Sequence, residues 1–174
     1  MKERIIYIAV IFILASSIFD VSGFSEDDLD NKVIWLLKPQ CIEAKSFSEG
    51  FAAVELKAGW GYINREGQVA IKPQFHYAAD FSEGVAAVGM LKRCFYKYGF
   101  INTNGEYILK PQYDYADNFS EGLAVAKAGK FCGYINKKGE FVIKPQFDSA
   151  YSFSEGLAAV KINGKYGYID KKEK

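Results

Sequence analysis

The sequence predicts an all-β protein built as a tandem array of four repeats of about 34 residues. Three recurring motifs carry this prediction. K-P-Q begins at residues 38, 72, 110 and 144, F-S-E-G at residues 47, 81, 119 and 153, and a Gly-aromatic-Ile motif at residues 61, 99, 133 and 167. Each series has two intervals of 34 residues and one of 38, which together locate a four-residue insertion between Gly84 and Gly99. So regular a recurrence indicates one structural unit used four times.

The composition is that of a folded protein without a strong charge. Of the 174 residues, 49% are apolar and 25% are charged, which is ordinary for a globular chain. The 22 Lys and Arg nearly balance the 21 Asp and Glu. We therefore expect no nucleic-acid partner, and membrane contact only through the N-terminal segment if that segment stays uncleaved.

Residues 1–23 are typical of a secretory signal peptide. Lys2 and Arg4 precede an apolar run over residues 5–19, and the small residues of V-S-G at 21–23 suit an export peptidase. This run is shorter than the roughly 20 residues of a spanning helix, so an uncleaved anchor is the less favoured alternative. We expect an exported protein, periplasmic, cell-surface or secreted, with a leader at 24–32 and one repeat domain at 33–174.

Each repeat is expected to form a three-stranded antiparallel meander. In the last copy, apolar runs at 157–162 and 165–169 flank Asn163-Gly164, a dipeptide typical of a tight hairpin. In the earlier copies an Asn-x-x-Gly turn then leads to a third strand, such as residues 140–144. We expect Pro145 to end that strand, because proline donates no ladder hydrogen bond.

The two ends of the predicted array are complementary. Residues 33–37 read as a third strand before the first K-P-Q, whereas the last copy ends without one. The first strand could complete the last unit in a closed, propeller-like ring, or the units could form an open superhelical stack. We favour the open stack, because a ring of four three-stranded sheets is tight and the insertion breaks its symmetry.

The F-S-E-G segments are predicted to form the corners between consecutive meanders. The Phe would anchor the corner in the core, and the Gly would supply a backbone conformation that other residues resist. The Ser and Glu would bond backbone groups or pair with the K-P-Q lysines. The corner residues are Phe47, Glu49, Gly50, Phe81, Glu83, Gly84, Phe119, Glu121, Gly122, Phe153, Glu155 and Gly156.

Few residues suit catalysis or metal binding. His76 is the only histidine, and no cluster of His, Cys and Asp has metal-ligand spacing. We expect no catalytic residue, no metal and no cofactor. Cys41 and Cys132 occupy aromatic positions of the repeat and are expected to be buried apolar residues. Cys94 lies in the insertion, and a bridge to Cys132 is one pairing that the repeat order permits.

A binding surface is expected where the repeats differ from one another. The insertion contributes Phe95 and Tyr96, and the varying corner positions contribute Tyr77, Tyr115 and Tyr151. Tyrosines beside polar groups suit recognition of a protein or of a sugar face. Alternatively, these aromatics pack between units and the array has a purely structural, accessory role. An enzyme is a remote third reading.

The repeat unit resembles the WG-repeat (KWG) family of bacterial proteins. The resemblance covers about residues 33–172 and rests on the order of the motifs G-Y-I, K-P-Q and F-S-E-G. The signature Trp-Gly stands only at Trp60-Gly61, where the other copies have Tyr98, Cys132 and Tyr166 before the glycine. The resemblance implies a tandem β-repeat scaffold, often exported, with no catalytic residues to carry over. We therefore expect a non-enzymatic module that binds an envelope protein or glycan.

Overall fold

The computed structural model describes Leu37 and residues 40–171 of the chain. Its contacts separate Met1–Trp35 from a second compact unit, Leu36–Lys174, to which all described residues belong. The expected signal segment, the leader and most of the strand expected at 33–37 therefore lie outside the described residues. Within the described residues, no helix has the length and apolarity needed to cross a membrane.

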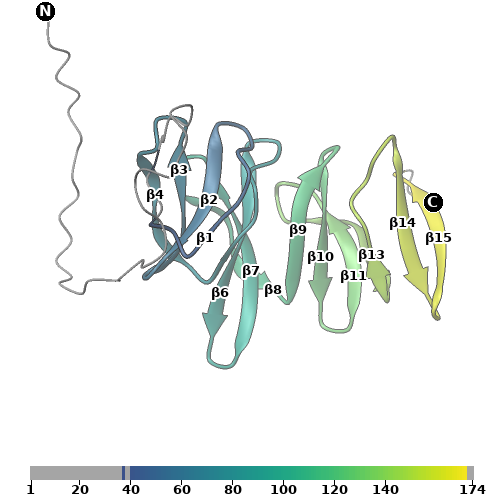
Figure 1. Ribbon diagram of the computed structural model, residues 1–174. Helices are drawn as coiled ribbons and strands as arrows, with labels where there is room; N and C mark the ends of the chain where they lie inside the picture. Colours follow the sequence, from purple (N-terminus) through teal and green to yellow (C-terminus); the bar gives the residue numbers. More distant parts are fainter. Residues whose placement is uncertain (1–36, 38–39, 172–174) are drawn as a thin grey trace, which may run out of the picture. The chain divides into compact units, whose positions relative to one another are not determined.

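The described residues form four antiparallel sheets, one for each repeat (Figure 1). In every sheet the strands are ordered as in the sequence. The first sheet comprises β1 (Glu43–Ala44), β2 (Phe51–Leu56), β3 (Gly59–Asn64) and β4 (Val69–Phe75). The second comprises β5 (Tyr77–Ala78), β6 (Val85–Lys92), β7 (Phe95–Asn102) and β8 (Tyr107–Tyr113). The third comprises β9 (Tyr115–Ser120), β10 (Leu123–Ala128), β11 (Phe131–Ile135) and β12 (Phe141–Phe147), and the fourth β13 (Ser149–Ala150), β14 (Leu157–Ile162) and β15 (Lys165–Asp170).

The expected three-stranded meander gains a short strand from the corner that precedes it. The segments before F-S-E-G form β1, β5, β9 and β13, which pair with the first long strand of their sheets. The four-residue insertion forms no separate loop. It lengthens β6 and β7 to eight residues each, with Arg93 and Cys94 between them.

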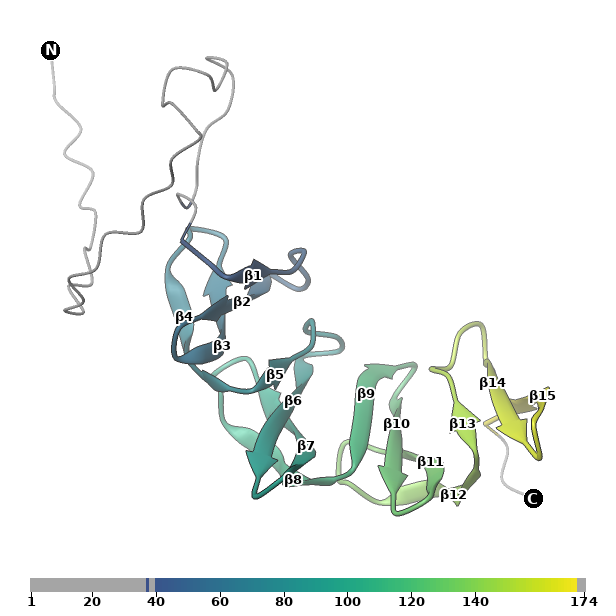
Figure 2. The same ribbon diagram turned by 60° about the horizontal axis from the view of Figure 1, so that its bottom comes forward.

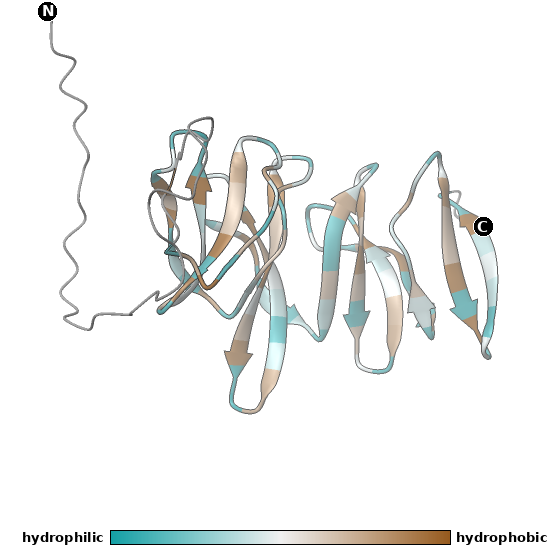
Figure 3. Cartoon of the chain, in the orientation of Figure 1, coloured by the Kyte–Doolittle hydropathy of each residue, from teal (hydrophilic) through white to brown (hydrophobic). Residues whose placement is uncertain are grey.

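Each sheet packs on the next, and the array is open. Three hydrophobic clusters of buried residues join the first sheet to the second, the second to the third, and the third to the fourth. Most residues of these clusters lie on strands, and Figure 3 shows hydrophobic stretches along the strands. Figure 2 shows the four sheets following one another, with β1–β4 and β13–β15 at opposite ends. The open stack that the sequence favoured is confirmed, and no cluster of described residues closes a ring.

The expectation that proline ends the third strand is wrong. Pro73, Pro111 and Pro145 lie inside β4, β8 and β12, each at an irregularity in the pairing with the neighbouring strand. These are the last strands of their sheets, and proline, which lacks an N–H donor, is tolerated at an irregularity in such a strand. The irregular backbone also presses on the glycine of the Gly-aromatic-Ile motif. A Cβ added to Gly133 would lie 2.5 Å from the Ile143 carbonyl oxygen and 2.7 Å from the Pro145 nitrogen.

Three of the four corner phenylalanines are core anchors, as expected. Phe81, Phe119 and Phe153 are each 1% exposed, and their rings lie 4.8 to 4.9 Å from an aromatic ring of the preceding sheet. For Phe47 the expectation is wrong, because no described sheet precedes its corner, and 46% of its surface is exposed.

The corner itself is a tight turn in which two residues adopt positive φ. In the first corner Glu49 has φ 50° and Gly50 has φ 89°, and the turn is closed by backbone hydrogen bonds between Ser48 and Phe51. The other three corners repeat these angles. The glycine was expected there, but the glutamate was not, since positive φ disfavours residues with a Cβ. In the first three corners a contact with the next corner compensates for this conformation, whereas Glu155 adopts it with no described corner beyond it.

That contact is a pair of side chains that bind the backbone of the next corner. The serine hydroxyl donates to the carbonyl oxygen of the next corner phenylalanine, as Ser48 does to Phe81 at 2.7 Å. The glutamate carboxylate accepts from the next corner's N–H groups, as Glu49 does from Glu83 and Gly84 at 2.7 and 2.8 Å. Ser82 and Ser120, and Glu83 and Glu121, continue the series. The corner bonds that the sequence predicted are confirmed, but they run between corners.

For Glu83 and Glu121, the predicted pairing of corner glutamates with K-P-Q lysines is wrong. Lys137 lies 3.5 Å from Glu83, and Lys171 lies 2.7 Å from Glu121. Both lysines follow the Gly-aromatic-Ile motif of the next sheet, which passes closer to the corner than K-P-Q does. These contacts and the backbone N–H donors of the next corner hold the pKa of the Glu121 carboxyl below its usual value.

We expect Glu83→Ala to lower the free energy of unfolding by about 1 kcal/mol, because it leaves the Gly122 N–H of the next corner without its acceptor. Glu155→Ala is the matched control, since no described corner follows Glu155, and it should leave stability unchanged. Urea unfolding at low protein concentration measures both. Equal losses in the two variants would contradict a bond between corners.

We expect Gly133→Ala to destabilise the fold by about 2 kcal/mol, because the added Cβ has no room beside the Ile143 carbonyl and Pro145. Gly167 holds the same place in the fourth sheet, where a Cβ would meet no described atom within 4 Å. Gly167→Ala should therefore be neutral in the same urea titration. Neutrality of both changes would show that the glycine does not serve this contact.

Candidate binding surface

Four tyrosines from the second and third sheets form a continuous chain of ring contacts, which we call the tyrosine row. The ring centroids of Tyr96 and Tyr98 are 6.4 Å apart, those of Tyr98 and Tyr77 are 5.6 Å apart, and those of Tyr98 and Tyr115 are 5.7 Å apart. His76 extends the row at one end, 6.4 Å from Tyr96. The row therefore crosses from one repeat to the next.

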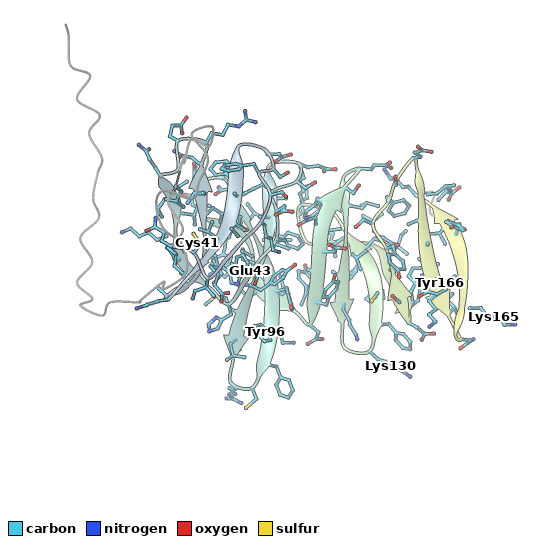
Figure 4. All side chains as sticks on the ribbon, in the orientation of Figure 1. Cys41, Glu43, Tyr96, Lys130, Lys165 and Tyr166 are labelled. Carbon is cyan, nitrogen blue, oxygen red and sulfur yellow. The ribbon has the colours of Figure 1, made fainter. Side chains whose placement is uncertain are left out.

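Strand geometry places these rings together. Tyr96 and Tyr98 are two residues apart on β7, so their side chains point to the same face of the sheet. Tyr77 lies on β5 and Tyr115 on β9, the short corner strands of consecutive sheets. Tyr96 and Tyr115 are exposed, whereas Tyr77 and Tyr98 are half-buried. Figure 4 shows Tyr96 on the lengthened β6–β7 hairpin.

The structure brings together three of the five predicted binding residues. Tyr77, Tyr96 and Tyr115 belong to the row, and Tyr98, which joins them, was missed because its repeat position reads as a core position. Phe95 is 73% exposed beside the hairpin turn and outside the row. Tyr151 is paired with Tyr166 on the fourth sheet, with ring centroids 6.2 Å apart.

An open depression on the third and fourth sheets separates Tyr115 from Tyr151. It is lined by both tyrosines, by Cys132, and by the polar residues Asp114, Asp117, Lys127, Asp148 and Ser149. Hydrogen bonds from the Lys97 side chain and the Gly129 N–H hold the pKa of the Asp114 carboxyl below its usual value. The depression is therefore aromatic and acidic, which suits hydroxyl or ammonium groups better than phosphates.

A lysine joins the row to the first sheet. The Lys45 ammonium lies 5.3 Å from the Trp60 ring centroid and 4.8 Å from that of Tyr77. Such cation–π contacts order a long side chain beside the aromatic surface. The contacts of the row thus reach the buried Trp60 ring of the first repeat through Lys45.

The cysteines and His76 form no reactive centre with their described neighbours. Cys132 is buried, as expected, Cys41 is half-buried and Cys94 is exposed, and all three are free thiols. Burial raises the pKa of the Cys41 and Cys132 thiols, which makes them poor nucleophiles. His76 accepts a long hydrogen bond, 3.4 Å, from the Leu91 N–H. No group of three His, Cys, Asp or Glu in the described part of the chain is placed to hold a metal ion.

Comparisons with known proteins identify the repeat. A family model described as WG containing repeat matches residues 35–58, 60–90, 98–130 and 133–166. No curated protein and no solved structure matches the chain.

We expect Tyr115 to resist deprotonation. The side chain is exposed on one side and covered on the other, and this partial desolvation, reinforced by the nearby charge of Asp117, raises its pKa to about 12. In a protein labelled with ¹³C at the tyrosine ζ carbons, the resonance assigned by its loss in Tyr115→Phe should remain that of a neutral phenol at pH 10.5. Circular dichroism at the same pH checks that the protein is folded, and a midpoint near 10 would contradict the packing of this ring.

Proposed function

The chain belongs to the WG containing repeat family, and from that premise we propose that it is an exported, non-enzymatic module that binds a macromolecule at the cell envelope. The observation that carries the proposal is the tyrosine row, in which exposed rings from two repeats meet on one face. Export is supported by the N-terminal sequence, with its basic start, apolar run and small residues.

The chemistry around the row favours an envelope protein or glycan. Tyrosine offers a rigid apolar ring with a polar hydroxyl, so it binds protein surfaces and sugar faces at a small entropic cost. The neighbouring depression adds three aspartates and one lysine. An anionic polymer such as nucleic acid would meet repulsion there.

An accessory array without a ligand is the second candidate. This alternative is supported by the packing of Tyr77 and Tyr98, which bury part of their surface against each other and against the core. Under this alternative the row would only seal the boundary between the second and third sheets. The two candidates differ in whether Tyr96 and Tyr115, the exposed members, contact a partner.

We expect saturable binding to isolated bacterial envelope fractions, weakened at least about tenfold in a double variant, Tyr96→Ser with Tyr115→Ser. Phe131→Ser is the matched control, because this ring is exposed on β11 outside the row. Prior treatment of the fractions with protease or with periodate distinguishes a protein from a glycan. Unaltered binding by the folded double variant would reject the row as the site, and no binding by any form would favour the accessory array.

A further inference from the structure

Among the described residues, nothing covers the outer side of the fourth sheet as the following sheets cover the other three. Tyr168 is 77% exposed, although it holds the repeat position of Tyr62, Phe100 and Tyr134, which are at most 1% exposed. Those three rings each pack on the phenylalanine of the following corner. Leu157, at the corresponding place on β14, is also exposed. The fourth sheet thus presents the residues that face a following sheet in the other repeats, without a described sheet packed on them.

The strand β15 also has room for a missing neighbour. In the first three sheets, the glycine of the Gly-aromatic-Ile motif lies under the Lys-Pro backbone of the following strand. At Gly167 a Cβ would meet no described atom within 4 Å, and among described strands β15 pairs only with β14. Three K-P-Q segments are used in this way, and the fourth stands at residues 38–40.

The last corner has no corner after it among the described residues, so its side chains lack the backbone groups that earlier corners bind. Ser154 and Glu155 are the repeat equivalents of the Ser and Glu side chains that hydrogen-bond to the next corner. Neither side chain has a hydrogen-bond partner among the described residues. The equivalents of Glu155 at Glu83 and Glu121 also contact a lysine of the next sheet.

The first sheet carries the other half of such an interface. Leu37 and Cys41 pack against the cluster of Ala52, Val54 and Ile63. They match Ile71 and Phe75 in the sequence repeat, which pack on the second sheet in the same way. In the second-sheet cluster, however, three further residues come from β2 and β3, namely Ala53, Trp60 and Tyr62. Their repeat equivalents are Ala159, Tyr166 and Tyr168 of the fourth sheet.

The first corner likewise lacks the contacts that later corners make with a preceding sheet and corner. The Phe47 ring is exposed, and the N–H groups of Glu49 and Gly50 have no acceptor among the described residues. Arg65 stands at the repeat position of Lys137 and Lys171 and forms no ion pair with a described residue. An acidic side chain in the place of Glu155 would satisfy both the N–H groups and this arginine.

We propose that copies of this chain associate head to tail, with the first sheet of one copy seated on the fourth sheet of another. Phe47 covers Tyr168, the Phe47 carbonyl accepts from Ser154, and Glu155 accepts from the Glu49 and Gly50 N–H groups. The open space beside Gly167 receives backbone of the second copy. A second copy is the occupant because each missing contact on one end has its counterpart on the other, and Figure 2 shows that these ends lie far apart within one chain. The contact is heterologous, so it joins copies into a filament or a closed ring and not into a symmetric dimer.

Sedimentation velocity over a concentration series tests the proposal on the protein as the expressing cell processes it. The average mass should rise with concentration above that of one chain. Gly167→Val fills the space on β15, and Phe47→Asp places a charge on the exposed ring position. Each change blocks one end only and should weaken association at least about tenfold. Ile108→Asp, an exposed apolar position on β8 away from both ends, is the matched control and should associate as the wild type does.

Mixing the two blocked variants gives the decisive result. One retains a working first sheet and the other a working fourth sheet, so the equimolar mixture should form one-to-one dimers that grow no further. Circular dichroism and thermal melting show that each variant is folded. A wild-type protein that stays monomeric would overturn the proposal. Self-association of either blocked variant alone, as a symmetric dimer would give, would also overturn it.

Discussion

The hydrogen bonds from each F-S-E-G corner to the backbone of the next are the interaction on which the array depends. Serine donates to a carbonyl and glutamate accepts from N–H groups of the same turn, so two consecutive corners are fixed in distance and in rotation. The glutamate adopts a positive φ, which costs of the order of 1 kcal/mol, and its charge-assisted bonds offset that cost. One four-residue motif therefore both turns the chain and connects its units.

A second contact, between the Lys-Pro backbone and the motif glycine, works inside each sheet. It brings the irregular last strand so close to its neighbour that only glycine fits, as Gly61 and Gly133 show. Sheets made in this way cover one another in sequence, because the aromatic ring of one sheet needs the corner phenylalanine of the next. Stability is then a property of neighbouring pairs, and the terminal sheets necessarily differ from the inner ones. Phe47 and Tyr168, equivalent to buried residues yet exposed, are the direct consequence.

The sequence predicted the features that recur in every repeat. It missed contacts that depend on which strands and turns lie side by side in space. Motif spacing predicted four β units in an open stack, and the corner glycines were expected at positive φ. Pro145 was misplaced because a rule for central strands was applied to the last strand of a sheet. The partner of Glu121 was misassigned because spacing along the chain does not reveal which turn of the next sheet lies beside a corner. Tyr98 was missed because its equivalents suggested a core residue, whereas the lengthened hairpin leaves it at a surface row.

The tyrosine row and the end faces have different origins, and this difference bears on function. The row uses two repeat positions that neither the corner bonds nor the Lys-Pro contact requires. From the first repeat to the fourth, the position on the corner strand holds Glu43, Tyr77, Tyr115 and Ser149. The position on the second long strand holds Trp60, Tyr98, Cys132 and Tyr166. Tyrosine occupies both kinds of position only in the second repeat, and Cys132 with Ser149 interrupts the row beyond Tyr115. Recognition through the row would therefore depend on the second and third repeats and not on the repeat motif itself. The outer sides of the first and fourth sheets, in contrast, present the residues of the repeat motifs. An interaction there would need no residue outside these motifs.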